Sequence, residues 1–377
     1  MDDKVVPVSE PSLDNAVRRH REQAGLSQQG LAELAGVSRQ AIVAIEGGRQ
    51  VPSTSLSLRL ARALRCGVED LFSLNLGSGI AARLAPRDLT KAAGARVALA
   101  EIDGTWAAHV LPPDASAAAD GLVTAAVSVR TALVRPLTDP TQLRRNVLVS
   151  GCAPILGALA QRVGGRFADA RATWLPASSH RSLDLLEQGL VHIAGLHLPG
   201  GPLGEDNVAA VRHRFPDQRM LLINLTRWRQ GLVLPAGNPL AIRSGADLLR
   251  RGLKLARREE GAGAHALVQR LLAEQGADHA RVLGPLAGGH AEVAQLVRLG
   301  AADVGVAIES VALAAGLDFV PLAEERFDLV VPAHLAEAAP VSRLLEMIDD
   351  SAFRSEMDDL PGYDGELAGH ATTLDAA

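Results

Sequence analysis

Apolar residues in the N-terminal part of the chain recur at the spacing of short helices. In residues 26–49 (LSQQGLAELAGVSRQAIVAIEGGR), one apolar stripe falls on 28–35 and a second on 39–46. Ser27 and Ser38 stand where helix N-caps are expected, and Gly36 separates the two runs. Two short helices joined by a glycine-containing turn are typical of a helix-turn-helix, whose second helix enters the major groove of DNA. This stretch therefore predicts a DNA-reading element.

Three further helices are expected to complete an all-α bundle over 12–76. The pattern places them at 13–24, 54–65 and 68–72, with Ser53 as the N-cap of the second. Residues 13–76 carry eight arginines against six acidic residues, whereas the whole chain has a net charge of −5. The predicted DNA-reading domain thus carries an excess of positive charge, which is expected of a surface that binds DNA phosphates.

The same domain resembles the XRE, or lambda-repressor-like, helix-turn-helix family. The segments that carry the resemblance include LSQ at 26–28, GVSR at 36–39, IVAIEGGR at 42–49 and a closing LF at 71–72. The resemblance implies a sequence-specific DNA-binding homodimer on a palindromic operator, with half-sites about one helical turn, roughly 34 Å, apart. Glu46 is expected to be structural, because phosphates repel a carboxylate.

Roles in DNA contact follow position by position from this resemblance. Arg39 and Gln40 are expected to bond base edges, because Arg can pair bidentately with guanine and Gln with adenine. Val43 would contact a thymine methyl group, and Gln28 and Arg49 would contact phosphates, which give affinity without sequence information. The predicted DNA-binding set is Gln28, Ser38, Arg39, Gln40, Val43 and Arg49. The alternative is a helical interaction module with a solvated, charged face.

Residues 80–145 change to a β-rich pattern. Two apolar runs flank Asp103-Gly104, a dipeptide typical of tight hairpin turns, and another apolar run spans 122–137. The segment 75–79 (NLGSG) predicts a linker ahead of them. We expect a small β-containing connector with no chemistry of its own.

From residue 146 the chain alternates short apolar strands with helical runs, which is the pattern of an α/β domain. Ligands of such domains lie at the carboxyl ends of the strands, where helix N-termini direct free N–H groups outward. Four strand-to-helix junctions together fit an oxyanion pocket. The residues expected to line it are Ser150 and Cys152, Ser178 and Ser179, the loop Gly261, Ala262 and Gly263, and Glu309.

This domain resembles a cytoplasmic branch of the periplasmic-binding-protein-like superfamily that is associated with molybdate or tungstate sensing. The resemblance spans 146–335 and rests on blocks such as GLHLPGG at 195–201, NLTRWRQGLVLPAGNP at 224–239 and GLDFVPLAEERFDLVVP at 316–332. It implies two α/β lobes joined by crossing strands, QGLVLP and RFDLVVP, with a small anionic ligand between the lobes. His197 and Arg227 are further candidates for that site, and Arg258 is the expected anion clamp.

The sequence departs from that branch at two points. The usual GSGTR-like loop is GAGAH at 261–265, which removes two hydroxyls and a guanidinium, and Ala153 stands where an Asp is expected. Backbone donors survive these changes. A molybdate or tungstate effector, a changed ligand and a domain without a ligand therefore all stay open. In the last case the domain would be a dimerisation or partner-docking platform.

The sequence displays no catalytic or metal-binding arrangement. Cys66 and Cys152 are far apart, and the phosphate-loop, nucleophile-elbow and zinc-protease motifs are missing. We expect no enzymatic activity, no metal and no covalent cofactor. An enzyme acting on a molybdenum-cofactor precursor would need a catalytic dyad that the sequence does not reveal. His290 and Glu292, which open a predicted helix, are interpreted as capping or surface groups, and Cys152 as a buried small residue.

The ends and the apolar runs complete the prediction. No apolar run reaches the roughly 18 to 20 residues that span a bilayer, and the polar N-terminus lacks the features of a secretory signal. These observations predict a cytoplasmic protein. The expected architecture is multidomain: a helix-turn-helix bundle over 12–76, a β-rich connector over 80–145, a two-lobed α/β domain over 146–354 and a disordered polar tail over 355–377.

Overall fold

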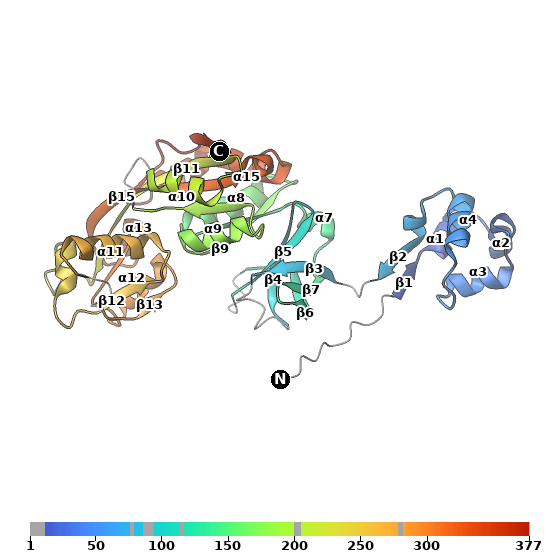
Figure 1. Cartoon of the computed structure of the whole chain (residues 1–377), viewed down its shortest axis with the longest axis horizontal. Helices are drawn as coiled ribbons and strands as arrows, with labels where there is room; N and C mark the ends of the chain where they lie inside the picture. The colour runs from blue at the N-terminus through green and yellow to red at the C-terminus, as the bar shows by residue number, and fades with distance from the viewer. Residues whose placement is uncertain are drawn as a thin grey trace. The chain divides into compact units, whose positions relative to one another are not determined.

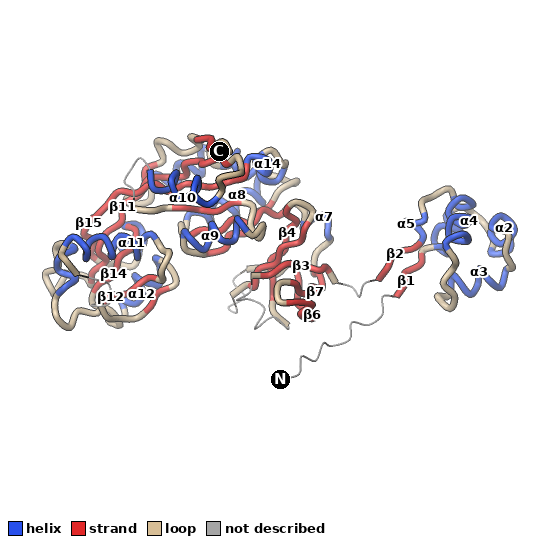
Figure 2. The backbone as a smooth tube through the Cα atoms, in the orientation of Figure 1, coloured by secondary structure: helices blue, strands red, loops and turns tan. Residues whose placement is uncertain are grey.

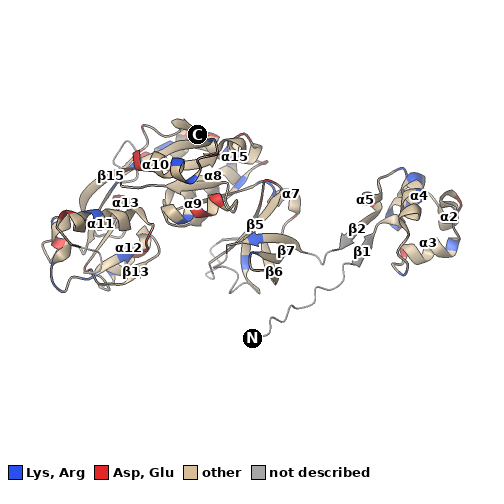
Figure 3. Ribbon diagram, viewed as in Figure 1, with Lys and Arg blue, Asp and Glu red and all other residues tan. Residues whose placement is uncertain are grey.

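The computed structural model describes residues 12–75, 79–85, 94–112, 117–199, 205–277 and 282–376. The chain divides into two compact units, Met1–Ile80 and Ala81–Ala377 (Figure 1). Basic and acidic residues are interspersed along the ribbons of both units (Figure 3). Among the described residues, no helix is long and apolar enough to cross a membrane.

The N-terminal unit is a helical bundle with a two-stranded sheet at its base. Ser27, Ser38 and Ser53 cap three of its helices, each accepting a hydrogen bond from the backbone N–H three residues on. Gly36 adopts the left-handed conformation (φ 63°), which permits the sharp turn between the second and third helices. The elements are β1 (Ser12–Asn15), α1 (Val17–Gln23), α2 (Gln28–Ala35), α3 (Arg39–Glu46), α4 (Thr54–Leu64), α5 (Val68–Leu71) and β2 (Phe72–Asn75). The predicted helix-turn-helix is confirmed.

The first element of the bundle differs from the prediction. Local periodicity predicts a helix over 13–24, but residues 12–15 form β1, and α1 begins only at Val17. β1 pairs antiparallel with β2, which lies at the far end of the bundle sequence. The side chain of Asn15 accepts a hydrogen bond from the N–H of Val17 (3.1 Å) and so starts α1. Because β2 is so distant along the chain, the spacing of apolar residues near β1 does not reveal this pairing.

A closed β-barrel follows. Its strands are β3 (Ile80–Leu84), β4 (Arg96–Ile102), β5 (Thr105–Val110), β6 (Gly121–Ser128) and β7 (Thr131–Pro136), in the order β3-β5-β4-β6-β7. The hairpin predicted at Asp103-Gly104 is confirmed, since β4 and β5 pair antiparallel and both turn residues have positive φ, 48° and 73°. α7 (Pro140–Leu143) leads out of the barrel.

The barrel packs against the α/β domain that follows it. The side-chain amide of Asn146 donates to the carbonyl oxygen of Leu99 (2.8 Å), and Arg171 forms an ion pair with Asp120 (2.8 Å). Apolar side chains of β4 and β5 belong to the same hydrophobic core as those of the first lobe. The predicted connector is therefore a built-in part of the second unit.

The α/β domain holds two groups of parallel strands in one sheet. β8, β9 and β10 are parallel in the first lobe, and β12, β13 and β14 in the second. The sheet order is β13-β12-β14-β11-β15-β10-β8-β9. The elements are β8 (Asn146–Gly151), α8 (Ile155–Arg166), β9 (Arg171–Pro176), α9 (Ser179–Glu187), β10 (Ile193–Leu196), α10 (Glu205–Arg214), β11 (Met220–Leu234), η1 (Gly245–Leu249), β12 (Leu255–Arg258), α11 (Gly263–Glu274), β13 (Leu286–Ala287), α12 (His290–Arg298), β14 (Val304–Ile308), α13 (Glu309–Ala314), β15 (Asp318–Pro332), α14 (Ala333–Ala336) and α15 (Ala339–Met347).

The two lobes are joined by β11 and β15, which pass from one strand group to the other (Figure 2). They contain the predicted crossing segments QGLVLP and RFDLVVP, and each is 15 residues long. The two strands are antiparallel. The beginning of β11 pairs with the end of β15 in the first lobe, and the reverse holds in the second. Register shifts lie between Asn224 and Thr226 and between Gln230 and Gly231. The predicted two-lobed architecture is confirmed.

The C-terminal tail is ordered, which corrects the prediction of disorder over 355–377. α16 (Ser351–Asp358) buries Phe353 and Met357, β16 (Tyr363–Asp364) pairs with the middle of β11, and β17 (Ala371–Leu374) pairs with its beginning. The tail is polar in composition, but an edge strand needs chiefly backbone partners and few apolar side chains. Leu374 is one such apolar side chain, and it is buried.

Candidate functional site

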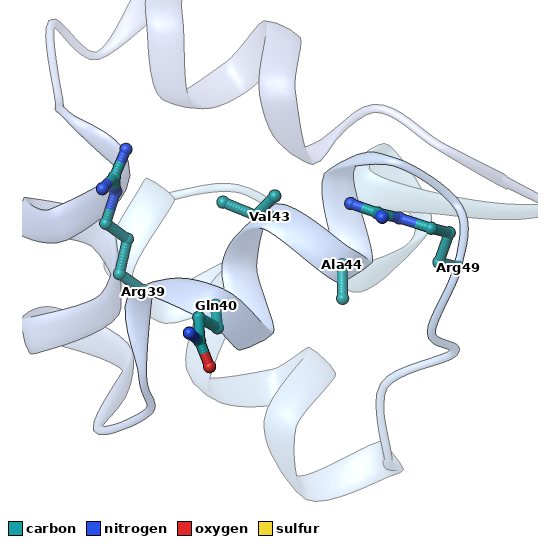
Figure 4. Close-up of a pocket in the computed structure, with 5 residues that line it drawn as sticks. All are labelled: Arg39, Gln40, Val43, Ala44 and Arg49. Carbon is teal, nitrogen blue, oxygen red and sulfur yellow. The ribbon is translucent and has the colours of Figure 1, made fainter.

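One row of predicted DNA-contacting side chains lies on α3 and the loop after it. Arg39, Gln40, Val43 and Arg49, together with Ala44, line an open hollow of about 540 Å³ (Figure 4). Arg39, Gln40 and Arg49 are exposed, and Val43 is half-buried. In the part of the chain that the structure describes, neither the Arg39 nor the Arg49 guanidinium has a hydrogen-bond or ion-pair partner. Both charges are therefore available to an external anion.

Gln28 and Ser38 have partners within the unit. Ser38 Oγ accepts the N–H of Ala41 (3.2 Å) as the cap of α3, and Gln28 Nε2 donates to Glu46 Oε2 (3.1 Å). The structure thus gives both residues a scaffold role, and their contact with DNA stays a prediction.

A buried ion pair joins α1 to the end of α3. Arg21 Nε lies 2.6 Å from Glu46 Oε1, and the two side chains are only 10% and 4% exposed. Arg21 also donates to the carbonyl oxygen of Leu26 (2.9 Å). Burial alone would raise the pKa of Glu46, but hydrogen bonds from Arg21 and Gln28 outweigh it and hold that pKa below its ordinary value. Glu46 is therefore structural, as expected.

We expect acid to weaken the N-terminal unit through this pair. The pKa of Glu46 is lower in the folded chain than its ordinary value of 4.5, so the pair stabilises the fold fully above about pH 4.5. That contribution is lost as the pH falls through the folded-state pKa. Calorimetric unfolding of the full chain across this range should show it. In the Glu46→Gln variant the transition of this unit should depend less on pH, and equal dependence in both proteins would refute the assignment.

Several predicted ligand residues of the second unit already bond to the chain itself. Ser150 Oγ lies 3.0 Å from Ser182 Oγ, and Ser179 Oγ donates to the carbonyl oxygen of His197 (2.9 Å). Arg258, the expected anion clamp, is buried and bonds to the carboxylate of Glu259 and the carbonyl oxygen of Ala287, both at 3.1 Å. These groups are not free to receive a ligand in this conformation.

Two other predicted ligand residues lie toward the tail. Arg227 pairs with Asp364 and with Glu366 (2.8 Å), and Glu309 pairs with Arg229 (2.6 Å). This placement corrects the expectation for Arg227, because two carboxylates of the tail neutralise its charge. No local pattern predicts these contacts, because the polar composition of the tail predicts disorder there.

The loop 261–263 brings the two lobes into contact. The N–H of His180 donates to the carbonyl oxygen of Gly261 (3.2 Å). A Cβ at Gly261 would lie 2.9 Å from His180 Cβ, and one at Gly263 would lie 2.3 Å from the His197 ring. Ala262 is buried between these glycines. The loop therefore uses its small residues for close packing between lobes.

Between the lobes, three side chains with strongly coordinating atoms converge. The Sγ of Cys152 and one ring nitrogen each of His197 and His290 lie within 4.8 Å of one another, and all three residues are buried. His197 Nδ1 lies 2.8 Å from Glu325 Oε2, and Gln230 donates to the same carboxylate. We refer to these five residues as the interlobe cluster.

The pKa values of the two histidines of the interlobe cluster are shifted in opposite directions. Burial lowers the pKa of His197, but its interactions with Cys152 and with the Glu325 carboxylate outweigh that effect and raise the pKa to about 10. Burial also lowers the pKa of His290, and the nearby charges of Arg258 and His197 lower it further. His290 is therefore neutral at pH 7.

Sequence reasoning missed most of the interlobe cluster. Its position at the start of a predicted helix indicates a capping or surface role for His290, whereas that residue is 1% exposed. Gln230 and Glu325, which are fully buried, lie in the crossing strands. A polar side chain inside a long buried strand is a signal that could have drawn attention to them.

A cavity of about 800 Å³ lies where the barrel meets both lobes. Its volume is within the range of small-molecule pockets. The start of α9 borders it with Ser178, His180 and Arg181, while the second lobe contributes Glu259 and Glu260. Barrel residues 109–112 close another side.

Comparison with known proteins supports this division of the chain. Residues 160–349 match the family model described as a PBP superfamily domain, and residues 15–73 match one described as a helix-turn-helix domain. The uncharacterized protein YvgK of Bacillus subtilis is 27% identical over 60% of this chain and 73% of its own length. An uncharacterized HTH-type transcriptional regulator of Methanothermobacter thermautotrophicus is 52% identical over 16% of this chain and 87% of its own.

Solved structures are similar to the second unit at low identity. The sulfate-binding protein SubI from Mycobacterium tuberculosis aligns with 58% of this chain and 86% of its own, at 15% identity and a TM-score of 0.44. An ABC-type phosphate transport receptor from Vibrio cholerae aligns with 57% and 98%, at 12% identity and a TM-score of 0.41. The PBP superfamily model spans half of the chain and covers most strands of the two-lobed sheet, from β9 to β15. The chain belongs to the family described as the PBP superfamily domain, and a helix-turn-helix domain precedes that domain in the sequence.

Proposed function

We propose that this protein is a sequence-specific, DNA-binding transcription regulator whose second unit binds a small effector. The observation that carries the proposal is the row of Arg39, Gln40, Val43 and Arg49 on the second helix of a helix-turn-helix and the loop after it, in which all but the half-buried Val43 are exposed. Arg and Gln are the side chains best suited to bidentate base contacts. The likeness of this unit to proteins named HTH-type transcriptional regulators supports the proposal. We assign it no catalytic reaction.

The proposal includes a homodimer acting in the cytoplasm. One such unit contacts one half-site, and helix-turn-helix proteins gain their specificity by placing two units on a palindrome. Analytical ultracentrifugation of the chain with and without operator DNA tests this part. A monomer that binds a single half-site with full affinity would refute it.

Replacing Arg39 with alanine should relax sequence preference at one base pair by about 1–3 kcal/mol. The reason is the loss of a bidentate base contact from the start of α3. Selection of binding sites from a random DNA library measures the change. Arg49→Ala is the matched control, since loss of a phosphate contact should weaken binding to all sequences alike and reduce the salt slope by about one. Unchanged specificity in Arg39→Ala would remove that residue from the reading set.

The finer part of the proposal concerns the effector, which we propose to be a small anion, with molybdate and tungstate as first candidates. Its support is the sequence resemblance, together with Ser178, His180 and Arg181 beside the cavity. Three carboxylates, of Asp184, Glu259 and Glu260, share that cavity, so an anion would be held at the α9 side.

Calorimetric titration of the full chain with molybdate, tungstate, sulfate and phosphate tests this choice. Tight binding of the first two with exclusion of sulfate would support a metal-oxyanion sensor. If none of the four anions binds, the proposed anionic effector is rejected. The alternative, in which the second unit is a dimerisation or partner-docking platform, is then favoured.

A further inference from the structure

We infer that Cys152, His197 and His290 form a transition-metal site that joins the two lobes, and that Zn²⁺ is the ion it fits best. Cys152 follows β8 and His197 follows β10 in the first lobe, whereas His290 begins α12 in the second. The site itself rests on the geometry below. Only its regulatory consequence rests on the proposed function.

The donor set and its spacing match zinc. Cys thiolate and His imidazole are the usual zinc ligands, at about 2.3 Å and about 2.0–2.1 Å, which places donors of a tetrahedral site roughly 3.3–3.6 Å apart. The three donor atoms here lie within 4.8 Å of one another before any ion draws them together. Small side-chain rotations would close the remaining distance.

His197 already has the orientation of a metal ligand. Its Nδ1 lies 2.8 Å from Glu325 Oε2, so Nε2 can coordinate a metal ion once that ion has displaced its proton. A carboxylate that holds the far nitrogen of a histidine is the usual outer partner in zinc sites, because it fixes the ring and raises its basicity. Gln230 donates to the same carboxylate and so fixes it in turn.

His290 provides an independent observation. Its side chain is 1% exposed, and neither ring nitrogen has a hydrogen-bond partner among the described residues. Burying an imidazole without partners costs free energy, so native structures rarely leave one in that state. A bound cation would satisfy one nitrogen lone pair and remove that cost.

The charges favour a cation over an oxyanion at this position. The buried Glu325 carboxylate would repel an anion, whereas it attracts a dication, which on binding displaces the protons of its thiol and imidazole ligands. Arg258 is the other cation close to His290, and Glu259 already neutralises it. The described residues offer three protein donors, so water or an effector atom would take the fourth position of a tetrahedral site.

A metal ion here would hold the lobes together, because its ligands come from both. Binding would therefore favour the closed arrangement, and removal by a chelator would release it. This adds a metal cation to the small effector as a second signal for the second unit of the proposed regulator.

Cobalt spectroscopy of the reduced, metal-free full chain tests the site. We expect one Co²⁺ per chain, with intense tetrahedral ligand-field bands and a thiolate-to-cobalt charge-transfer band that Zn²⁺ abolishes by displacement. The variant Cys66→Ser is the matched control, since it removes the other cysteine, and it should give the wild-type spectrum. Cys152→Ser should lose the charge-transfer band. Absence of the band in the wild-type protein would overturn the inference without depending on any variant's ability to fold. Its persistence in Cys152→Ser would overturn it as well.

Affinity measurements distinguish a metal site from a reactive thiol. Glu325→Gln should weaken Zn²⁺ binding by about 10–100-fold, and His290→Gln by more, because it removes a donor itself. Zn²⁺ should also protect Cys152 from alkylation, and equal alkylation with and without Zn²⁺ would overturn the site in favour of a nucleophilic cysteine. Operator binding is measured in parallel. Metal binding without any DNA binding would reject the proposed function and support the metal site. DNA binding without metal binding would support the proposed function and reject the metal site.

Discussion

Replacing Glu46 with alanine should destabilise the N-terminal unit by about 3–5 kcal/mol. Glu46 is buried against Arg21 at 2.6 Å, so the substitution leaves a guanidinium without its counter-charge at a position that is only 10% exposed. It also removes the acceptor of Gln28. Since small domains have a total stability of about 5–15 kcal/mol, this loss should remove a large share of the unit's stability and weaken operator binding.

The loss of helix in this unit can be followed by far-UV circular dichroism during urea unfolding of the full chain. Glu33→Ala is the matched control, because Glu33 lies exposed on α2 and bonds only to Gln29 among the described residues. A surface change of that kind should stay within about 0.5 kcal/mol of wild type. Equal stability of the two variants would show that the Arg21–Glu46 pair does not hold the bundle together.

Removing residues 361–377 should destabilise the second unit by roughly 3–5 kcal/mol. The deletion exposes the apolar surface that Leu374 and Tyr363 cover, and burial of each large side chain contributes about 1.5–3 kcal/mol. It also uncovers an edge of β11, which should promote association between chains.

Tryptophan fluorescence reports this unit alone, since Trp106, Trp174 and Trp228 all lie within it. The exposed Thr372 provides a control, and Thr372→Ala should unfold at the wild-type urea concentration. Leu374→Ala should give an intermediate loss. If the truncated chain unfolded at the wild-type midpoint, the tail would contribute nothing to the fold, as its polar composition first suggested.

Features set by neighbouring residues could be predicted from the sequence. The caps Ser27 and Ser38 and the left-handed Gly36 define the helix-turn-helix, and Asp103-Gly104 defines a hairpin, because each acts within a few residues. The crossing strands were also visible, since their apolar runs are long.

Features that depend on contacts between residues far apart in the sequence could not be predicted. The pairing of β1 with β2 replaced the first turn of a predicted helix, and the tail found partners on β11 that neutralise Arg227. The interlobe cluster gathers Cys152, His197 and His290 from segments whose spacing matches no known ligand pattern. Their meeting depends on how the two lobes are joined, which no local pattern encodes.

The two register shifts in the β11–β15 pair set a direction for any motion of the second unit. At such shifts the ladder of hydrogen bonds is interrupted, and the strands bend most easily there. One shift ends at Gly231, where a Cβ would lie 2.2 Å from the carbonyl oxygen of Val320, so the backbones approach too closely for any side chain. We therefore expect the lobes to rock about these two points when they open. An angle measured between the lobes would then report the state of the whole unit.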